Sequence, residues 1–554
     1  MPDLGSGELP VPAPVHPVDF PPFEPTVPRM IRQAVDAYGP LELGVLGDQR
    51  MTFADADAAS AAIAKGFLAI GVGKGTRVGL LAPNSPDWIA TWLAIGRIGA
   101  IGVLANTYYK ARELDWVLRH ADVQVLLSVS RYLGHDYLAR LEEVVSPGHD
   151  PVIASPSHPL LRSVWVWGQN DSPWASSMDD LVAAGEAVSD EVLSAAEAEV
   201  TPADEFTVVY TSGSTSSPKG AVHTQGAVVC HAHNLWQFRD LEVGDRIYSA
   251  MPLFWVGGMV MGLVGSIYAG TCLIFDERFE PGATLALIEK EKVSIVVGWP
   301  HMAQLLTNHP DFVQRDLSSV RGGSLYDLLP PEKQIDDPEL RVNSLGMTET
   351  LGPHTLGKMG ARLPEEKRGS FGWAVPGMEH RIVNPETGED CPTGERGEVW
   401  VRGYALMSRL YKVDRADTFT PDGWYCTGDS GYFDDDGYFY FTGRMGDLIK
   451  SSGMNIAPRE IELVIEELDQ VMHAFVCGVP HPDRLEDVAA AVVLRPGQPL
   501  IGEELKTYVA ERVASYKVPR HLAVYNTPDA LPWLDSGKID LMGVKRILTE
   551  RFSG

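Results

Sequence analysis

Cysteine is scarce in this sequence, and the few that are present follow no pairing pattern. Five cysteines are spread through 554 residues, an odd number, without a Cys-x-x-Cys pair. Structural zinc sites need thiolate or imidazole ligands at short repeated spacings, and disulfide frameworks usually have an even count. His231 and His233 come nearest to a ligand pair, but residues two apart on a helix do not share a face. The sequence therefore predicts a reduced, cytoplasmic protein without a structural zinc site.

Basic residues are outnumbered throughout the chain. Lysine and arginine total 46 against 74 aspartate and glutamate, which gives a formal net charge of -28. A mean field of this sign repels phosphate, so nucleic acid is not an expected partner and anionic membranes are not an expected surface. An anionic ligand would need local donors, such as backbone N–H groups, single Lys or Arg side chains, or a metal ion.

Long apolar runs are also lacking, with one exception at residues 247–275. This stretch has no charged residue, but Pro252 and five glycines interrupt it, and its flanks are not basic. We predict a buried strand, turn and helix there, and no integral membrane segment. The N-terminus has no basic and apolar leader pattern, so a signal peptide is not expected there. Its many prolines predict an extended arm over residues 1–28. The C-terminal RFSG is not a peroxisomal signal.

The chain is longer than the roughly 250–300 residues that one core usually supports, so several subdomains are expected. Strands alternate with helices through the first two-thirds, which predicts α/β sheets of parallel strands. One of the helices spans residues 52–70, with Thr52 as N-cap and Gly71 at its end. From Gly369 short alternating strands predict a small β-barrel or β-rich subdomain, and after Arg444 a mobile α+β module follows. The predicted divisions are an arm (1–28), a large domain (29–443), a hinge (444–450) and a small domain (451–554).

A hydroxyl-rich loop, Tyr210 to Gly220 (YTSGSTSSPKG), follows the apolar strand FTVVY. Its N–H and O–H groups can wrap a phosphate chain, and Lys219 adds a positive charge. The Walker A pattern GxxxxGK[ST] is absent. On its own, a loop rich in Ser, Thr and Gly more often has no phosphate-binding role.

Five further segments follow that loop in a fixed order. They are MPLFWVGG (251–258), LGMTET (345–350), WYCTGD (424–429), GRMGDLIKSSGMNIAPREIE (443–462) and DSGKID (535–540). Together the six segments resemble the signature motifs of the adenylate-forming superfamily, which comprises acyl-CoA synthetases, amino-acid adenylation domains and luciferases. The resemblance runs from about residue 50 to residue 545 and is greatest to acyl-CoA synthetases. It implies a large N-terminal domain and a small C-terminal domain that rotates between two half-reactions.

The resemblance implies a role for each matched residue. The phosphates of ATP would be held by Thr211, Ser212, Gly213, Ser214, Thr215 and Lys219. Adenine would lie against Gly323, Ser324, Leu345 and Gly346, and the ribose against Asp429, Phe441 and Arg444. Mg²⁺ would be bound by Glu349 and Thr215, while Thr348 contacts the α-phosphate. The acyl group would lie against Phe254, Trp255, Gly257 and Gly258.

Lys538 is the strongest single candidate for a catalytic residue. Attack of a carboxylate on the α-phosphate gathers negative charge, which a desolvated ammonium stabilises. The resemblance further implies that the hinge and the coenzyme A path involve Asp447, Lys450, Ser452 and Gly453. After domain rotation Lys538 would leave the site, and Gly453 would open a tunnel for pantetheine.

Several positions depart from the family pattern. Leu345 replaces an aromatic residue, Ser216 a loop glycine, and Trp255 a histidine at the mouth of the acyl pocket, while Trp533 and Leu534 precede the lysine loop. These departures affect ATP affinity and acyl preference more than the type of reaction.

The stretch FWVGG contains no carboxylate to pair an α-ammonium group, so a fatty, aryl or alicyclic acid is expected rather than an amino acid. For any one residue of this apolar stretch, a place in the core is equally compatible with the sequence. The expected partners are a carboxylic acid, ATP and coenzyme A, with a homodimer left open. Two alternatives also remain open, namely delivery to a carrier protein and a catalytically weak nucleotide-binding protein.

Overall fold

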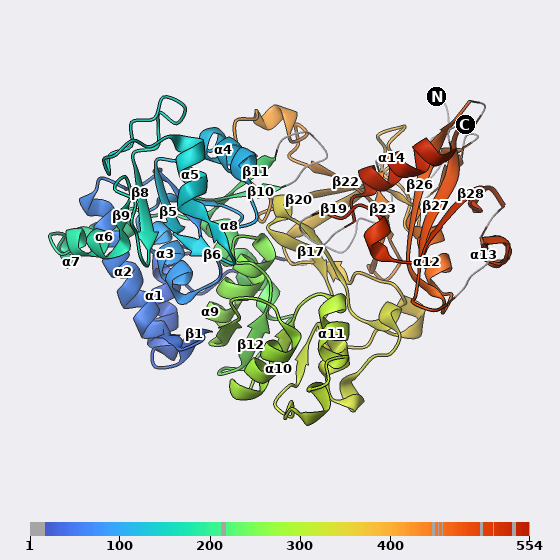
Figure 1. Cartoon of the computed structure of the whole chain (residues 1–554), viewed down its shortest axis with the longest axis horizontal. Helices are drawn as coiled ribbons and strands as arrows, with labels where there is room; N and C mark the ends of the chain where they lie inside the picture. The colour runs from blue at the N-terminus through green and yellow to red at the C-terminus, as the bar shows by residue number, and fades with distance from the viewer. Residues whose placement is uncertain are drawn as a thin grey trace, which may run out of the picture. The chain divides into compact units, whose positions relative to one another are not determined.

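The computed structural model (Figure 1) describes most of the chain. The described residues are 17–211, 218–445, 449–451, 454–456, 458–482, 484–498, 502–513, 515–534 and 539–552. They divide into two compact units. The larger holds residues 14–379 and 401–425, and the smaller holds residues 380–400 and 426–554.

Two mainly parallel sheets are the largest sheets of the larger unit, as the alternation of strands and helices predicts. One sheet has the strand order β21-β11-β10-β4-β3-β5-β8-β9, and the other β15-β14-β12-β13-β1-β2. The first comprises β21 (Arg409–Leu410), β11 (Lys219–Thr224), β10 (Glu205–Thr211), β4 (Ile101–Leu104), β3 (Arg77–Leu81), β5 (Val125–Val129), β8 (Ser163–Trp167) and β9 (Ser176–Ser177). The second comprises β15 (Gly322–Gly323), β14 (Ile295–Val297), β12 (Arg246–Ser249), β13 (Cys272–Phe275), β1 (Glu42–Leu46) and β2 (Gln49–Thr52). The central strands are buried on both faces, which is typical of parallel sheets covered by helices.

Helices cover these sheets, and the predicted helix at residues 52–70 is confirmed. It is α2 (Phe53–Ala69), and its N-cap Thr52 exchanges hydrogen bonds with Asp55 in a capping box. The other helices of this unit are α1 (Val27–Tyr38), α3 (Pro86–Arg97), α4 (Ala111–His120), α5 (Tyr137–Val145), α6 (Met178–Gly185), α7 (Asp190–Ala198), α8 (Gln225–Trp236), α9 (Gly265–Ala269), α10 (Pro281–Lys290) and α11 (Pro300–Thr307). Helix α2 packs against α3 and α6 (Figure 1, blue to teal). Every residue of α3 except Asp87 is buried, including Arg97, which pairs with Asp57 and Glu197.

The described part of the N-terminal arm is attached to α8. Asp19 N–H donates to Asn234 Oδ1 over 2.9 Å, and Asn234 Nδ2 donates back to the Asp19 carbonyl over 2.8 Å. His233 Nε2 lies 3.2 Å from Asp19 Oδ2. His233 therefore has a protein partner at Nε2.

The apolar stretch at residues 247–275 is buried, as predicted, but its helical part differs from the prediction. After β12 the chain forms a π-helix, η1 (Gly257–Val264), and only then α9 and β13. Buried Arg239 donates from Nη1 to the carbonyl of Met261, and a Cβ at Gly265 would lie only 2.8 Å from that nitrogen. A side chain that enters the helical hydrogen-bond ladder in this way, next to glycines, favours a locally widened helix. Within the described ranges, no helix combines the length and apolar composition needed to cross a bilayer.

The smaller unit is built on antiparallel strands. A four-stranded sheet has the order β19-β20-β22-β23, and a second sheet has the order β25-β24-β27-β26, with β28 added in parallel to β27. The strands are β19 (Met378–Val383), β20 (Gly397–Gly403), β22 (Tyr425–Phe433), β23 (Phe439–Arg444), β24 (Ile449–Ser451), β25 (Met454–Ile456), β26 (Val471–His481), β27 (Leu485–Leu494) and β28 (His521–Tyr525). Its helices are α12 (Pro458–Glu466), α13 (Gly502–Ala510) and α14 (Leu541–Phe552); α12 and α14 both pack on β26 (Figure 1, orange to red).

Leu485, at the start of β27, is a strained position in this unit. Its φ is +72°, in the left-handed region, and its side chain is 65% exposed. Because glycine adopts this conformation without a Cβ clash, we expect Leu485→Gly to raise the free energy of unfolding by about 1 kcal/mol. Urea unfolding would measure the change. Leu463→Gly, on the exposed face of α12, is the matched control and should lower the free energy by about 1 kcal/mol. Destabilisation by both variants would contradict the assignment of strain.

Candidate active site

The predicted phosphate loop is the connection between two paired strands. In the antiparallel pair β10–β11, Thr211 and Lys219 are direct partners, so the hairpin brings the two ends of the loop together. A Cβ at Gly220 would lie 2.9 Å from Val208 Cγ1, which explains the glycine after Lys219. Lys219 is exposed and Thr211 is half-buried. The predicted contacts of Ser212, Gly213, Ser214 and Thr215 lie outside the described residues.

Thr348 and Glu349 lie on a 3-10 turn, η6 (Thr348–Thr350), between β16 (Ser344–Met347) and β17 (Gly352–Leu356). Thr350 Oγ1 donates to the Gly352 carbonyl over 2.7 Å and accepts from the Met347 N–H over 3.2 Å. The Met407 N–H donates to the Glu349 carbonyl over 2.8 Å. Both Thr348 and Glu349 are half-buried. The turn therefore presents one carboxylate and one hydroxyl from a backbone that is held at several points.

Leu345 and Gly346 lie on β16, immediately before this turn. Leu345 is half-buried, and its N–H donates to Thr355 Oγ1 over 3.3 Å. A Cβ at Gly346 would lie 2.3 Å from the Gly352 carbonyl oxygen, so no side chain fits there. The glycine of the motif is thus explained by the close approach of β17.

Two buried histidines lie behind the turn, and the sequence analysis did not select His223. His223 Nε2 donates to the Thr348 carbonyl over 2.8 Å, and burial lowers its pKa to about 4. His231 Nδ1 lies 3.2 Å from Tyr404 Oη, and burial lowers its pKa to about 3. The one available signal was the position of His223 in an apolar strand, where a polar side chain needs a partner. The described residues contain no group of three or more His, Cys, Asp or Glu that could hold a metal ion.

The lowered pKa of His223 predicts a pH-dependent stability. The histidine is neutral in the folded protein, whereas its ordinary pKa is 6.5, so the unfolded chain binds more protons below pH 6.5. The stabilisation is present above that pH and is lost as the pH falls towards 4. Between pH 7.5 and pH 5, the free energy of unfolding of His223→Gln is expected to fall by about 2 kcal/mol less than that of wild type. Urea unfolding at both pH values would test this, and equal losses would contradict it.

The predicted adenine strand is β15, at the edge of its sheet. Gly323 has a φ of +129°, and a Cβ there would lie 2.0 Å from the Val296 carbonyl oxygen, so only glycine is accommodated. Ser324 Oγ accepts from the Gly298 N–H over 3.1 Å and donates to the Gly298 carbonyl over 2.9 Å. The backbone alone therefore forms the surface of the strand at Gly323, and its contact with adenine stays a prediction.

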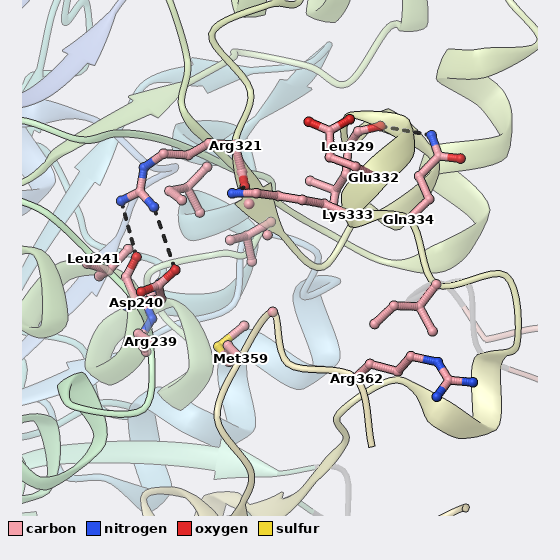
Figure 2. Close-up of a pocket in the computed structure, with 16 residues that line it drawn as sticks. Arg239, Asp240, Leu241, Arg321, Leu329, Glu332, Lys333, Gln334, Met359 and Arg362 are labelled. Carbon is pink, nitrogen blue, oxygen red and sulfur yellow. Dashed lines mark hydrogen bonds and ion pairs between the residues drawn. The ribbon is translucent and has the colours of Figure 1, made fainter. Parts of the chain in front are cut away.

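A cavity of about 330 Å³ borders Gly322 and Gly323 (Figure 2). Ile295 and Val297 of β14 contribute to its lining. Figure 2 shows Arg321 joined to Asp240 and Gln334 joined to the backbone of Leu329, so several polar groups at its edge already have protein partners. Leu345, Gly346 and Glu349 do not line this cavity.

The predicted acyl segment is attached to the large sheet through Asn84. Asn84 Nδ2 donates to the Met251 carbonyl over 2.9 Å, and its Oδ1 accepts from the Leu253 N–H over 2.7 Å. A Cβ at Gly258 would lie 2.0 Å from the Pro252 carbonyl oxygen, and one at Gly257 would lie 2.9 Å from Met251 Cε. Both glycines therefore permit the chain to turn closely into η1.

Aromatic rings form a continuous chain over this segment. Tyr108, Phe254, Trp255 and Trp299 meet edge to face in that order, with ring centroids 6.4, 5.8 and 6.3 Å apart. Phe254 is buried, whereas Trp255 is half-buried. Leu253, Met259 and Val260 of the same apolar stretch belong to the core.

In the smaller unit, Asp429 and Arg444 are adjacent. They are partners across β22 and β23, and Arg444 Nε lies 2.9 Å from Asp429 Oδ1. Asp429 is only 3% exposed, and its N–H donates to Thr427 Oγ1 over 3.0 Å. Phe441 is half-buried on β23, opposite Gly431. A buried carboxylate on a fixed strand is suited to accept hydrogen bonds from vicinal hydroxyl groups.

Ser430, the residue after Asp429, makes a second set of contacts. Ser430 Oγ accepts from Arg396 Nε over 2.8 Å and from Thr442 Oγ1 over 3.0 Å. The sequence analysis selected neither Arg396 nor Thr442. Asp447, Ser452, Gly453 and Lys538 lie outside the described residues, and for Lys450 only its backbone place in β24 is described.

Comparisons with known proteins agree with this architecture. The sequence model described as "AMP-binding enzyme" matches residues 32–411, and that of the "AMP-binding enzyme C-terminal domain" matches residues 460–538. The putative acyl-CoA synthetase YngI of Bacillus subtilis (strain 168) is 31% identical over 550 residues, which cover 95% of this chain and 98% of YngI. The mitochondrial medium-chain acyl-CoA ligase ACSF2 of Danio rerio is 31% identical over 520 residues, 90% of this chain and 84% of that protein.

A solved structure shares the fold. ATP-bound MatB from Rhodopseudomonas palustris superposes with a TM-score of 0.79 at 22% identity, covering 96% of this chain and all of that one. The first family model spans well over half of the sequence, and both relatives align over 90% or more of this chain. The chain therefore belongs to the AMP-binding enzyme family, among the acyl-CoA synthetases and ligases of the adenylate-forming superfamily.

Proposed function

We propose that this enzyme activates a hydrophobic carboxylic acid, of the fatty, aryl or alicyclic class, and transfers it to coenzyme A. A carboxylate oxygen attacks the α-phosphorus of ATP, the bond to the β-phosphate oxygen breaks, and pyrophosphate leaves. The thiol sulfur of coenzyme A then attacks the acyl carbonyl carbon, AMP leaves with the electron pair of the broken C–O bond, and the thiol proton is released to solvent. The observation that carries the choice of acid is the aromatic chain from Tyr108 to Trp299, which follows the acyl segment.

The aromatic chain from Tyr108 to Trp299 favours an apolar acid. Trp255 is half-buried and lies between Phe254 and Trp299, so part of its ring remains available to a ligand. Residues 251–264 contain no charged side chain. An α-ammonium group placed there would lose its hydration without gaining a carboxylate partner, which costs several kcal/mol. A hydrocarbon group carries no such cost.

The nucleotide residues fit a magnesium–ATP complex. Mg²⁺ usually takes one or two protein carboxylates together with phosphate oxygens, and Glu349 offers one such carboxylate on a fixed turn. When bound, Mg²⁺ would neutralise charge on the phosphates. Thr211 and Lys219 border the phosphate loop, and Asp429 would accept from the ribose hydroxyls while Arg444 lies beside it. Lys538 would stabilise charge at the α-phosphate.

The acceptor and the location are separate parts of the proposal. Coenzyme A is the expected acceptor, and a carrier protein is the alternative that the sequence left open. AMP release that depends on added free coenzyme A would support the first, and release that requires a phosphopantetheinyl carrier protein would support the second. A cytoplasmic location and a homodimer remain predictions.

The deciding experiment is ATP–pyrophosphate exchange with a panel of acids. Octanoate, 3-phenylpropanoate and cyclohexanecarboxylate represent the three proposed classes, and phenylalanine is the matched control because it differs from 3-phenylpropanoate only by its α-ammonium group. We expect exchange with at least one of the three acids and none with phenylalanine. Exchange with phenylalanine alone would contradict the apolar pocket. No exchange with any acid in the presence of Mg²⁺ would favour a catalytically weak nucleotide-binding protein.

A further inference from the structure

One side chain connects the two parts of the site that meet ATP's phosphates. His223 lies on β11, four residues after Lys219, and β11 is one arm of the hairpin that carries the phosphate loop. Its Nε2 donates to the carbonyl of Thr348, the residue next to Glu349. The contact spans 125 positions in the sequence. It fixes the start of the Thr348–Thr350 turn to the hairpin.

The turn needs support from outside because its own backbone is strained. Leu351, which follows it, has a φ of +60°, in the left-handed region, and is completely buried. A residue with a Cβ pays about 1–2 kcal/mol for this conformation. The Thr348 carbonyl accepts from the Leu351 N–H over 3.0 Å as well as from His223, so both of its lone pairs are used. Loss of the histidine would leave the strained turn with one fewer anchor at its first residue.

We propose that His223 is a positioning residue that holds Thr348 and Glu349 in register with the phosphate hairpin, so that both reach the same magnesium–ATP complex. The proposal rests on the proposed function. The histidine touches neither nucleotide nor metal; it acts through the turn. A displacement of about 1 Å in catalytic groups can cost about 100-fold in rate, so a single buried hydrogen bond at this place has a large effect.

The chemistry of the contact requires a neutral donor. The Thr348 carbonyl can only accept, so Nε2 carries the proton, and Nδ1 has no hydrogen-bond partner among the described residues. Burial keeps the imidazole neutral, in agreement with its lowered pKa. Glutamine can place an amide N–H near the position of Nε2, whereas leucine fills similar space without a donor. The two variants therefore separate the hydrogen bond from the packing.

The test compares His223→Leu and His223→Gln with wild type by two measurements. Calorimetry without acid gives the Kd for ATP in the presence of Mg²⁺, and ATP–pyrophosphate exchange gives kcat with the best acid of the panel. For His223→Leu we expect a Kd about tenfold higher and a kcat about 10- to 100-fold lower, and for His223→Gln values within about threefold of wild type. Thioester formation from supplied acyl-AMP, which needs no triphosphate, should stay within about threefold for both variants.

A matched control is His158→Leu. His158 is also buried, and its Nδ1 lies 3.0 Å from Ser157 Oγ, in a loop remote in sequence from the site motifs. The His158→Leu variant should have a lower thermal stability and an unchanged Kd for magnesium–ATP. If His223→Leu does not fold, the test compares His223→Gln with His223→Asn. The shorter side chain of asparagine places its amide away from Thr348. The asparagine variant should then show the higher Kd.

Two results would overturn the proposal. One is a folded His223→Leu with unchanged Kd and exchange kcat, and the other is an equal loss in adenylation and in thioester formation. Both differ from a failure of the proposed function, in which wild type itself shows no exchange with any acid.

Discussion

Replacing Lys538 by alanine is expected to lower the rate of acyl-AMP formation by about 1,000-fold. Removal of one preorganised donor from a developing oxyanion typically costs about 100- to 1,000-fold, and an ammonium ion carries a full charge. The residue lies outside the described residues, so the expectation rests on the DSGKID motif. In the two-conformation scheme the lysine serves only the first half-reaction. Thioester formation from supplied acyl-AMP should therefore remain within about threefold of wild type.

The control for this prediction is Lys545→Ala. Lys545 lies on α14 in the same unit, and its Nζ is 2.9 Å from Glu486 Oε1. Its removal takes away one lysine charge without touching the motif, so both half-reactions should be unchanged. Equal loss of both half-reactions in Lys538→Ala would contradict the assignment of the lysine to adenylation. Normal exchange in that variant would contradict its catalytic role.

Replacing Gly453 by tryptophan is expected to produce the opposite pattern. The resemblance places Gly453 at a tunnel for the pantetheine arm of coenzyme A, where a missing side chain leaves space. A large ring there should hold the thiol away from the acyl carbonyl and lower thioester formation by about 100-fold, the loss that a misplacement of about 1 Å causes. ATP–pyrophosphate exchange should be retained, because coenzyme A takes no part in it.

The matched control is Gly73→Trp, which adds the same ring at an open position. An added Cβ at Gly73 would meet no atom within 4 Å, and Gly73 belongs to the larger unit. Both half-reactions should survive in this variant. Unchanged thioester yield in Gly453→Trp would contradict the tunnel, and loss of exchange would show that the ring disturbs adenylation. Together, Lys538→Ala and Gly453→Trp would separate the two half-reactions in one protein.

Local patterns were sufficient to predict much of the fold. Thr52 as N-cap, the Ala-rich run after it and Gly71 at its end predict α2 to within a residue, because these signals act within a few turns of the chain. The burial of residues 247–275 was also predicted from the sequence, because an uncharged stretch that is interrupted by Pro252 and five glycines and lacks basic flanks favours a buried strand, turn and helix. The π-helix did not follow, because it depends on Arg239, which enters the helical ladder from another segment.

The candidate site likewise contains residues that the sequence predicted and residues that only the structure identified. The roles of motif residues such as Thr348, Glu349 and Asp429 were predicted from the sequence because the resemblance to the adenylate-forming superfamily lies in short ordered motifs that contain them. His223 and Arg396 were not, because each acts through a hydrogen bond to a residue far away along the chain or on another strand. The pairing of Arg444 with Asp429 likewise depends on the register of β22 and β23.

The family and the general type of reaction could be inferred from the sequence alone, because both follow from short ordered motifs whose residues lie close together along the chain. The folded structure was needed to show how the turn of Glu349 is held, which glycines cannot carry a side chain, and which residues of the apolar stretch belong to the core. Those properties depend on packing and hydrogen bonds between segments distant in the chain. No local pattern of residues contains that information.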